Sequence, residues 1–193
     1  MALISVTPDH ALRTEAEACI QRSYGLTYGA RVVQFPKLLM ALANCDGVQA
    51  VAGLRTEADG FFCERYLAKN IPATLKQVAN ATADNATIVE VTSLAALRPS
   101  SFLRLIMTLR TWIPRRGFEW AIFTATERLR QTLQTQNLPL IPLAKADPSC
   151  VGNAVDWGSY YATDPMVCAV ARDHLLARTA GRIDRGSVTA AAF

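Results

Sequence analysis

Glu90 is the first residue that suggests chemistry, because it is a carboxylate inside an apolar, β-branched run, Ile88–Val91. Burying a carboxylate costs several kcal/mol unless it is paired, hydrogen-bonded or protonated. Burial also raises the pKa of a carboxyl group toward neutrality, where a general base works best. Glu90 is therefore predicted to deprotonate or anchor an amine. The alternative is a carboxylate that pairs with an arginine inside the sheet.

Glu64 is the second candidate acid. It lies in an aromatic stretch, Phe61–Leu67, that has the composition of a strand and is expected beside the strand of Glu90. Two carboxylates facing one cleft would couple, and their pKa values would separate. The alternative is an ordinary surface alternation of Glu64 with Arg65.

Hydroxyl-bearing and aromatic side chains are candidate substrate contacts. Thr124 and Thr126 lie where a predicted strand, Trp120–Thr124, leads into a helix. They therefore either cap that helix or contact a thioester. Three aromatic residues near the N-terminus either pack in the core or form a hydrophobic lid over a substrate: Tyr24, Tyr28 and Phe35.

Arginine and serine side chains near the predicted central helix are candidate phosphate contacts. A guanidinium matches the geometry of a phosphate, and it would equally suit the acidic face of a carrier protein. The alternative is a solvated surface. The residues at the start of the helix are Arg98, Ser100, Ser101 and Arg104, and those near its end are Arg115 and Arg116.

Hydrophobic periodicity, capping residues and turn residues predict the elements that position these side chains. The Asp46-Gly47 pair predicts a hairpin, because the turn needs a positive φ where glycine stands. The predicted strands are Leu3–Val6, Leu38–Leu42, Gln49–Leu54, Phe61–Leu67, Ile88–Val91, Trp120–Thr124 and Leu140–Leu143. The first predicted helix starts at Pro8 with Thr7 as its cap and ends near Gly25, and the second spans Pro72–Ala79. The third spans Phe102–Ile113 with Ser100 or Ser101 as its cap, and the fourth follows Thr126.

The order of these elements is strand, helix, antiparallel strands and then β-α-β-α-β. This order predicts an α+β domain with a mixed sheet, in which ligands favour the carboxyl ends of the parallel strands beside a helix N-terminus. One domain is predicted over residues 1–171, and residues 172–193 are predicted to be a terminal helix or a tail.

Composition narrows the class of protein. The chain has 193 residues, of which 51% are hydrophobic and 19% charged, so it is not disordered as a whole. Its net charge of +4 suits anionic ligands but is too small for a dedicated nucleic-acid binder. Five scattered cysteines and two histidines predict neither a disulfide framework nor a metal site. No signal peptide and no membrane-length apolar run is evident, so a cytoplasmic protein without a membrane span is expected.

Five motifs in fixed order resemble the family named thermostable hemolysin, over about residues 1–171. The resemblance implies the fold of the GCN5-related N-acetyltransferases (GNAT), a mixed, mostly antiparallel sheet flanked by helices. The family is also distantly similar to the acyl-homoserine-lactone synthases. In those enzymes an aromatic N-terminal segment closes over an amine, and a glutamate on the strand matching Ile88–Val91 is the base or the amine contact. The motifs are Cys19–Ala30, Phe61–Leu67, Ile88–Ala95, Gly117–Thr126 and Trp157–Tyr161.

Two departures from the family pattern affect the expected donor. GNAT acetyltransferases carry a glycine-rich loop that approaches a pyrophosphate, whereas the equivalent stretch here, Leu97–Ser101, contains no glycine. Where the family strand is expected to continue Val-Gly-Asn-Leu, this chain has Thr92-Ser93. The first departure implies a carrier-protein thioester more than coenzyme A, and the second makes Ser93 a candidate substrate contact.

The resemblance and the residues together predict an acyltransferase. It would join an acyl group, carried as acyl-phosphopantetheine on an acyl or peptidyl carrier protein or as acyl-coenzyme A, to a small amine, and would need no tightly bound cofactor. One alternative is a non-catalytic GNAT-like protein that binds a ligand or partner. The other is a membrane-lytic effector, as the family name suggests.

Overall fold

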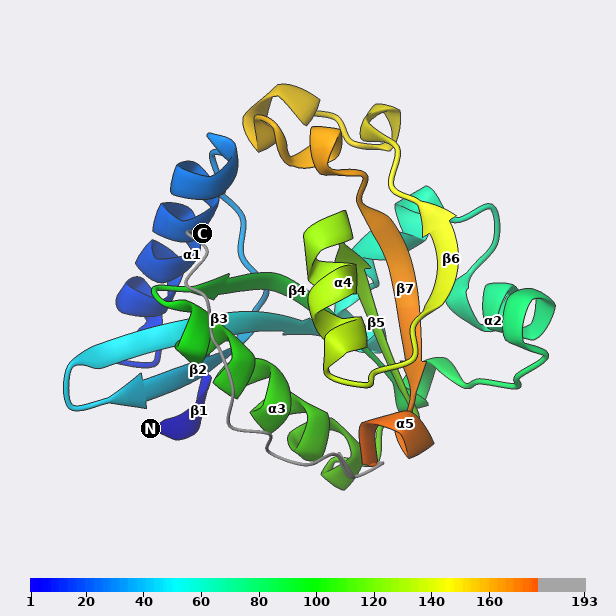
Figure 1. The fold of residues 1–193 in the computed structure, drawn as a ribbon, viewed down its shortest axis with the longest axis horizontal. Coiled ribbons are helices and arrows are strands. Elements are labelled where there is room, and N and C mark those ends of the chain that lie inside the picture. The colour runs from blue at the N-terminus through cyan, green and yellow to red at the C-terminus, as the bar shows by residue number, and fades with distance from the viewer. Residues whose placement is uncertain (177–193) are drawn as a thin grey trace.

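The computed structural model describes residues 1–176, which form a seven-stranded sheet flanked by helices (Figure 1). The strand order is β1-β2-β3-β4-β5-β7-β6, and β4 and β5 alone pair in parallel among the described strands. This is the predicted α+β fold with a mixed, mostly antiparallel sheet. The strands are β1 (Ala2–Val6), β2 (Leu38–Asn44), β3 (Gly47–Arg55), β4 (Ile88–Ala96), β5 (Trp120–Ala125), β6 (Ile141–Lys145) and β7 (Met166–Ala171). The α-helices are α1 (Arg13–Tyr28), α2 (Ile71–Ala79), α3 (Pro99–Arg115), α4 (Glu127–Thr135) and α5 (Arg172–Leu176).

Alternation along the strands divides the core between the two faces of the sheet. On β3, Val51 belongs to the cluster under α1, whereas Ala50 and Ala52 belong to the cluster under α3. The same alternation on β5 places Ile122 in the cluster that includes α2, and Phe123 in the cluster that includes α4 and α5. Helices α1 and α2 thus cover one face, and α3, α4 and α5 cover the other.

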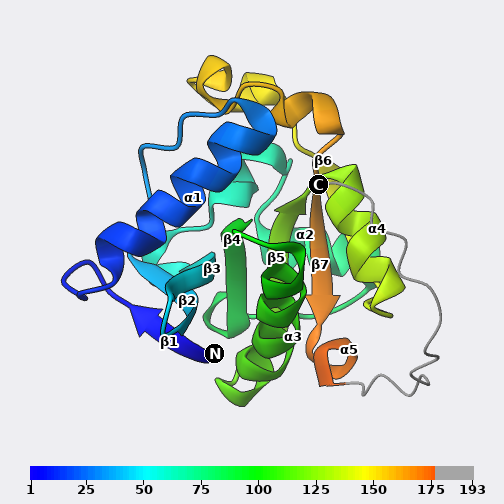
Figure 2. The ribbon, with the colours of Figure 1, turned by 60° about the vertical axis from the view of Figure 1, so that its left-hand side comes forward.

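The two parallel strands separate after a short contact. The ladder between β4 and β5 contains three residue pairs, the last of which is Glu90 with Ile122. Strand β4 continues to Ala96 and β5 to Ala125, and the two diverge beyond the last pair (Figure 2). On its other side β4 remains paired with β3, although a register shift between Val51 and Gly53 and a positive φ of 51° at Ser93 mark a bulge there.

The first helix differs from its prediction at both ends. It begins at Arg13 rather than Pro8, because the preceding residues form tight turns in which the His10 ring accepts a hydrogen bond from the Leu12 N–H. It continues past Gly25 and ends at Gly29, whose φ of 66° suits a left-handed cap.

Two further local predictions are wrong. The stretch predicted as a strand, Phe61–Leu67, is a 3₁₀ helix, η2 (Phe62–Tyr66). Its first N–H groups bond a carboxylate from the sheet rather than a neighbouring strand, as described below. Helix α3 has Pro99 at its first position and Arg98 as its N-cap, with no side-chain cap bond, so neither Ser100 nor Ser101 caps it.

The structure describes only the first residues of the predicted C-terminal helix or tail, residues 172–193. Arg172–Leu176 forms the short helix α5, and the remainder of the predicted helix or tail, residues 177–193, lies outside the described residues. Within residues 1–176, no helix combines the length and apolarity needed to cross a membrane.

Candidate functional site

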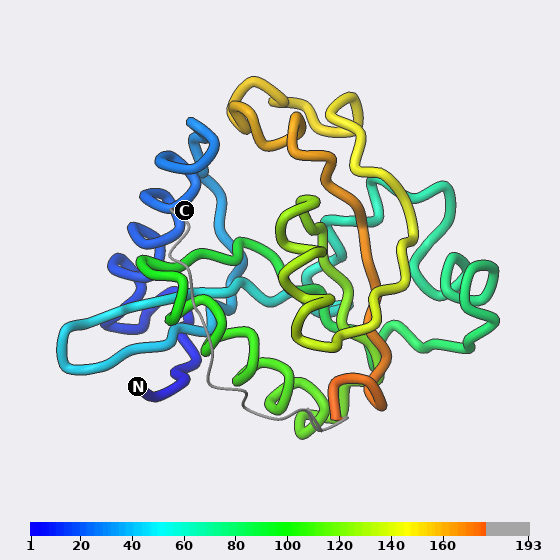
Figure 3. The backbone as a smooth tube through the Cα atoms, viewed as in Figure 1, coloured from blue at the N-terminus to red at the C-terminus, as the bar shows by residue number. Residues whose placement is uncertain are grey.

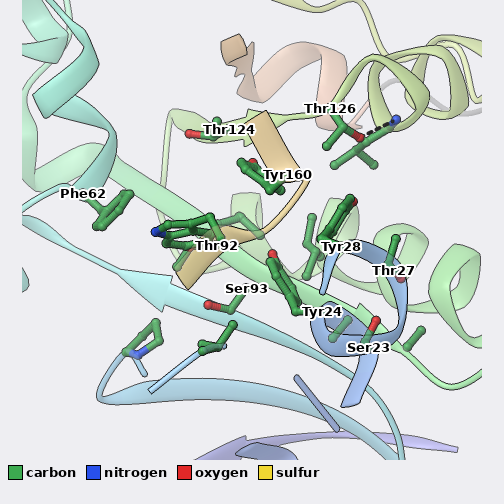
Figure 4. A pocket seen from close by; sticks show the side chains of 18 of the residues that line it. Ser23, Tyr24, Thr27, Tyr28, Phe62, Thr92, Ser93, Thr124, Thr126 and Tyr160 are labelled. Carbon is green, nitrogen blue, oxygen red and sulfur yellow. Dashed lines mark hydrogen bonds between the residues drawn. The ribbon is translucent and has the colours of Figure 1, made fainter. Parts of the chain in front are cut away.

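A cavity of about 590 Å³ occupies the gap between the diverging strands (Figure 4). On one face of the sheet it is bounded by side chains of α1 and η2, including Tyr28 and Phe62. On the other face it reaches the N-terminal ends of α3 and α4, where Phe102 and Leu129 line it. The cavity therefore connects both faces of the sheet through the opening between β4 and β5.

The roof of the cavity joins two segments from opposite ends of the chain, the end of α1 and the 3₁₀ helices η5 (Ala154–Trp157) and η6 (Tyr160–Thr163). The backbone N–H of Ser159 donates to the Tyr28 carbonyl at 2.8 Å, and the Arg31 N–H donates to the Asp156 carbonyl at 2.6 Å. Gly158 lies against Tyr28 and Gly29 so closely that a Cβ there would overlap the Tyr28 carbonyl oxygen. We call this junction the clasp. From the clasp the chain descends beside the sheet to β2 (Figure 3).

Aromatic side chains from both halves of the clasp form one wall of the cavity. The Tyr28 and Tyr160 rings meet edge to face with centroids 5.3 Å apart, and Trp157 lies 5.5 Å from Tyr160. Tyr24 stacks on Tyr160 at 6.4 Å. Burial raises the pKa of all three tyrosine hydroxyls, so they stay protonated at neutral pH. This wall therefore offers aromatic surface and neutral hydroxyls.

The strands contribute three hydroxyl side chains to the cavity: Thr92, Ser93 and Thr124 (Figure 4). The hydroxyl oxygen of Thr124 is buried and has no hydrogen-bond partner among the described residues. An unpaired buried hydroxyl is unfavourable, so this hydroxyl is a candidate hydrogen-bond partner for a bound ligand. Thr126 differs, since its hydroxyl accepts the Leu129 N–H and caps α4.

The charges that line the cavity are mostly positive. Five arginines line it, Arg31, Arg55, Arg65, Arg98 and Arg128, against a single carboxylate in the described part of the chain, that of Asp156. The side chains of Arg31 and Arg98 make no hydrogen bond or ion pair with residues 1–176. Arg98 and Arg128 lie at the N-terminal ends of α3 and α4, where the helix dipoles add positive potential. This end of the cavity suits an anion.

Glu90 is buried, with 1% of its surface exposed, but it does not line the cavity. Its carboxylate accepts the backbone N–H groups of Phe62 at 2.6 Å and Cys63 at 3.0 Å. Burial raises its pKa, while these two bonds and the nearby Arg55 act in the opposite direction. Glu90 therefore fixes the start of η2, whose Phe62 and Tyr66 do line the cavity.

The structure brings six of the predicted site residues to the cavity: Tyr24, Tyr28, Ser93, Arg98, Thr124 and Thr126. Six others lie outside its lining: Glu64, Glu90, Phe35, Ser100, Ser101 and Arg104. Glu64 accepts the Ile71 N–H at 2.9 Å at the start of α2, and Phe35 packs on the core under α1. Their proposed roles in catalysis or binding remain predictions.

Several lining residues were not predicted from the sequence. The sequence predicts no site role for Trp157, Tyr160, Asp156 or Arg31, although all four line the cavity. The many aromatic residues of Trp157–Tyr161 could have indicated a binding site. The sequence could not show that this segment lies beside Tyr28, because the contact joins residues more than one hundred positions apart.

A family model and several solved structures match this chain and agree with the fold described above. Residues 6–175 match the model of a family described as thermostable hemolysin. No curated protein matches the chain. FeeM, an N-acyl amino acid synthase from uncultured soil microbes, has 13% identity and a TM-score of 0.61, with 90% of this chain and 93% of that chain covered.

Two further solved structures have the same fold. The CoA-dependent acyl-homoserine lactone synthase BjaI, solved with SAM and isopentyl-CoA, has 13% identity and a TM-score of 0.58, with 90% and 85% covered. A putative N-acetyltransferase from Lactobacillus plantarum has 12% identity and a TM-score of 0.54, with 89% and 99% covered. At these identities the likeness establishes a GNAT-like fold.

Proposed function

The chain belongs to the thermostable hemolysin family, and we propose that it transfers an acyl group from a thioester to a small amine. The observation that carries the proposal is the cavity between β4 and β5, which is lined by residues from elements on both faces of the sheet. Two substrates can thereby meet from opposite sides. The solved structures of the same fold include acyl-transferring enzymes, which supports the same reaction class.

The thioester donor is assigned to the opening between the strands and to the ends of α3 and α4. Beyond Glu90 the backbone of β4 has no ladder partner from β5, so its polar groups are available to an extended, amide-containing arm such as phosphopantetheine. Arg98 and Arg128 lie where the phosphate of that arm would be held. Both a carrier protein and coenzyme A present this arm.

The amine is assigned to the space under the clasp, beside the tyrosines and Asp156. In the proposed reaction the Asp156 carboxylate accepts a proton from the amine, and the amine nitrogen attacks the thioester carbonyl carbon. The carbon–sulfur bond then breaks, the nitrogen loses its extra proton to form the amide, and the leaving thiolate takes up that proton. The Thr124 hydroxyl is proposed to donate to the carbonyl oxygen as negative charge develops there.

The test is a thiol-release assay on the purified chain. Acyl-coenzyme A and acylated carrier protein are offered as donors with a panel of amino acids and simple amines, and mass spectrometry identifies the amide. Thiol release that requires both donor and amine is expected. Ligand binding without any thiol release would overturn the proposal and would favour the non-catalytic binding protein instead.

A Thr124→Val variant sharpens the assay, because it removes the orphan hydroxyl while preserving the shape of the side chain. We expect the rate to fall by roughly 100-fold, as for loss of one donor to a developing oxyanion. The free energy of unfolding should rise by about 1 kcal/mol, since an unpaired buried hydroxyl is removed. A variant of unchanged rate would show that Thr124 makes no contact in the transition state.

A further inference from the structure

A second, much smaller cavity lies behind β4, in the core between the sheet and α3, α4 and α5. Its volume is about 50 Å³. A water-sized group needs roughly 10–15 Å³ by the same measure, so it would hold about four such groups. We call it the chamber. Its lining residues are Val91, Leu94, Ile106, Leu109, Arg110, Ile113, Ala121, Phe123, Leu133, Leu138, Val170 and Leu175.

The chamber is apolar. Arg110 is the single charged residue in its lining, and its guanidinium donates to the carbonyls of Gln136, His174 and Leu175. The remaining lining side chains are aliphatic or aromatic and offer a water no hydrogen-bond partner. Because a buried water needs two or more polar partners, the chamber suits hydrocarbon rather than water.

The chamber and the reaction cavity have two lining residues in common. Val91 and Leu94 line both spaces, and Leu94 belongs with Ser93 to the β4 bulge between the pairs Thr92–Gly53 and Ala95–Val51. The chamber is therefore adjacent to the segment of β4 where the thioester carbonyl is assigned.

We propose that the chamber receives the far end of the acyl chain, so that the donor is a medium-length fatty acyl thioester rather than acetyl. This inference rests on the proposed acyl transfer. The carbonyl carbon stays between the strands near Thr124, and the chain passes Val91 and Leu94 toward Ala121. Rotation of the Leu94 side chain would join the two spaces, and burial of each methylene would strengthen binding of the longer donor.

Variants of the chamber test this assignment, with acetyl-, hexanoyl- and decanoyl-coenzyme A as donors. Ala121→Val reduces the chamber without touching the larger cavity, whose lining excludes Ala121. It should lower kcat/KM for the decanoyl donor by roughly tenfold or more and leave the acetyl donor unchanged. Leu94→Ala shortens a side chain that lines both spaces and should raise the preference for decanoyl over hexanoyl.

Leu105→Ala is the matched control for Leu94→Ala. Leu105 lies in the same core but lines neither cavity, so its truncation should lower stability and leave the order of donor preference unchanged. Thermal unfolding of each variant establishes that it is folded. A wild type that prefers the acetyl donor would contradict the proposed role of the chamber. So would an Ala121→Val variant with the donor preference of the wild type.

Binding of decanoate separates this inference from the proposed reaction. Calorimetry should show that the wild type binds decanoate and that Ala121→Val binds it at least about tenfold more weakly. If no donor releases thiol but this difference holds, the reaction fails and the chamber stands. Equal binding by both proteins refutes the chamber, whatever the outcome of the thiol assay.

Discussion

Glu90 and Asp156 are two carboxylates that lie in different positions relative to the cavity. Glu90 accepts two backbone N–H groups of η2 outside the cavity, whereas Asp156 lines the cavity beneath the clasp. We therefore expect Asp156→Asn to lower the rate by roughly 100-fold or more, as for loss of a general base, with little change in stability. Steady-state kinetics and thermal unfolding of the variant, measured side by side, check this.

Glu90→Gln is expected to act mainly on stability. An amide offers one acceptor oxygen instead of two, so the Phe62 or Cys63 N–H loses its partner, which costs about 1–3 kcal/mol. A Glu90→Gln protein as stable as the wild type but inactive would instead make Glu90 the base.

The pH dependence of this difference follows from the raised pKa of Glu90. Between the ordinary and the raised pKa the native state holds a proton that the unfolded chain has lost. Wild-type stability therefore falls as the pH rises through this window, and it is fully present below the ordinary pKa. Glu90→Gln lacks this titration, so the gap between the two proteins should narrow as the pH rises. Urea denaturation at several pH values measures the gap.

The clasp forms the roof of the cavity, and its geometry depends on one glycine. Gly158 has a φ of 53° and a ψ of −126°, a conformation that side chains disfavour, and its neighbour Ser159 donates to the Tyr28 carbonyl. Gly158→Ala should separate the end of α1 from η5. We expect a loss of more than about 1 kcal/mol of stability and a KM for the amine raised more than kcat is lowered.

Gly152→Ala is the control for the clasp variant. Gly152 belongs to the same connection, but a Cβ there meets nothing within 4 Å and its φ is not positive, so stability should stay near that of the wild type. Equal stability of the two variants would contradict the structural role of the clasp.

Helix α3 and the hairpin of β2 and β3 were predictable because their signals are local. The apolar positions of α3 repeat at helical spacing, and Asp46-Gly47 specifies the turn. The aromatic stretch Phe61–Leu67 was not predictable in the same way. Its composition suits a strand, but it becomes η2 because Glu90, 27 positions from Cys63, bonds its first N–H groups.

The candidate site was predictable in parts. The burial of Glu90 follows from its apolar neighbours, and the sequence places Thr124 correctly at the end of a strand that enters the site. Asp156 and Trp157 could not be assigned to it, because they reach the cavity only where the 3₁₀ segment meets the end of α1. Long-range contacts of this kind leave no periodic pattern in the sequence.

The fold and the proposed reaction together suggest a source for the haemolytic activity that the family name records. Within residues 1–176 no helix has the length and apolarity to span a membrane. The proposed reaction would instead join an apolar acyl chain to a polar amine, and such a product is an amphiphile that enters bilayers. We expect the purified chain alone to release no dye from phosphatidylcholine vesicles. The reaction mixture with decanoyl donor and amine should release it, and the same mixture with Thr124→Val should release far less. Equal leakage by both proteins without substrates would place the lytic activity in the polypeptide itself.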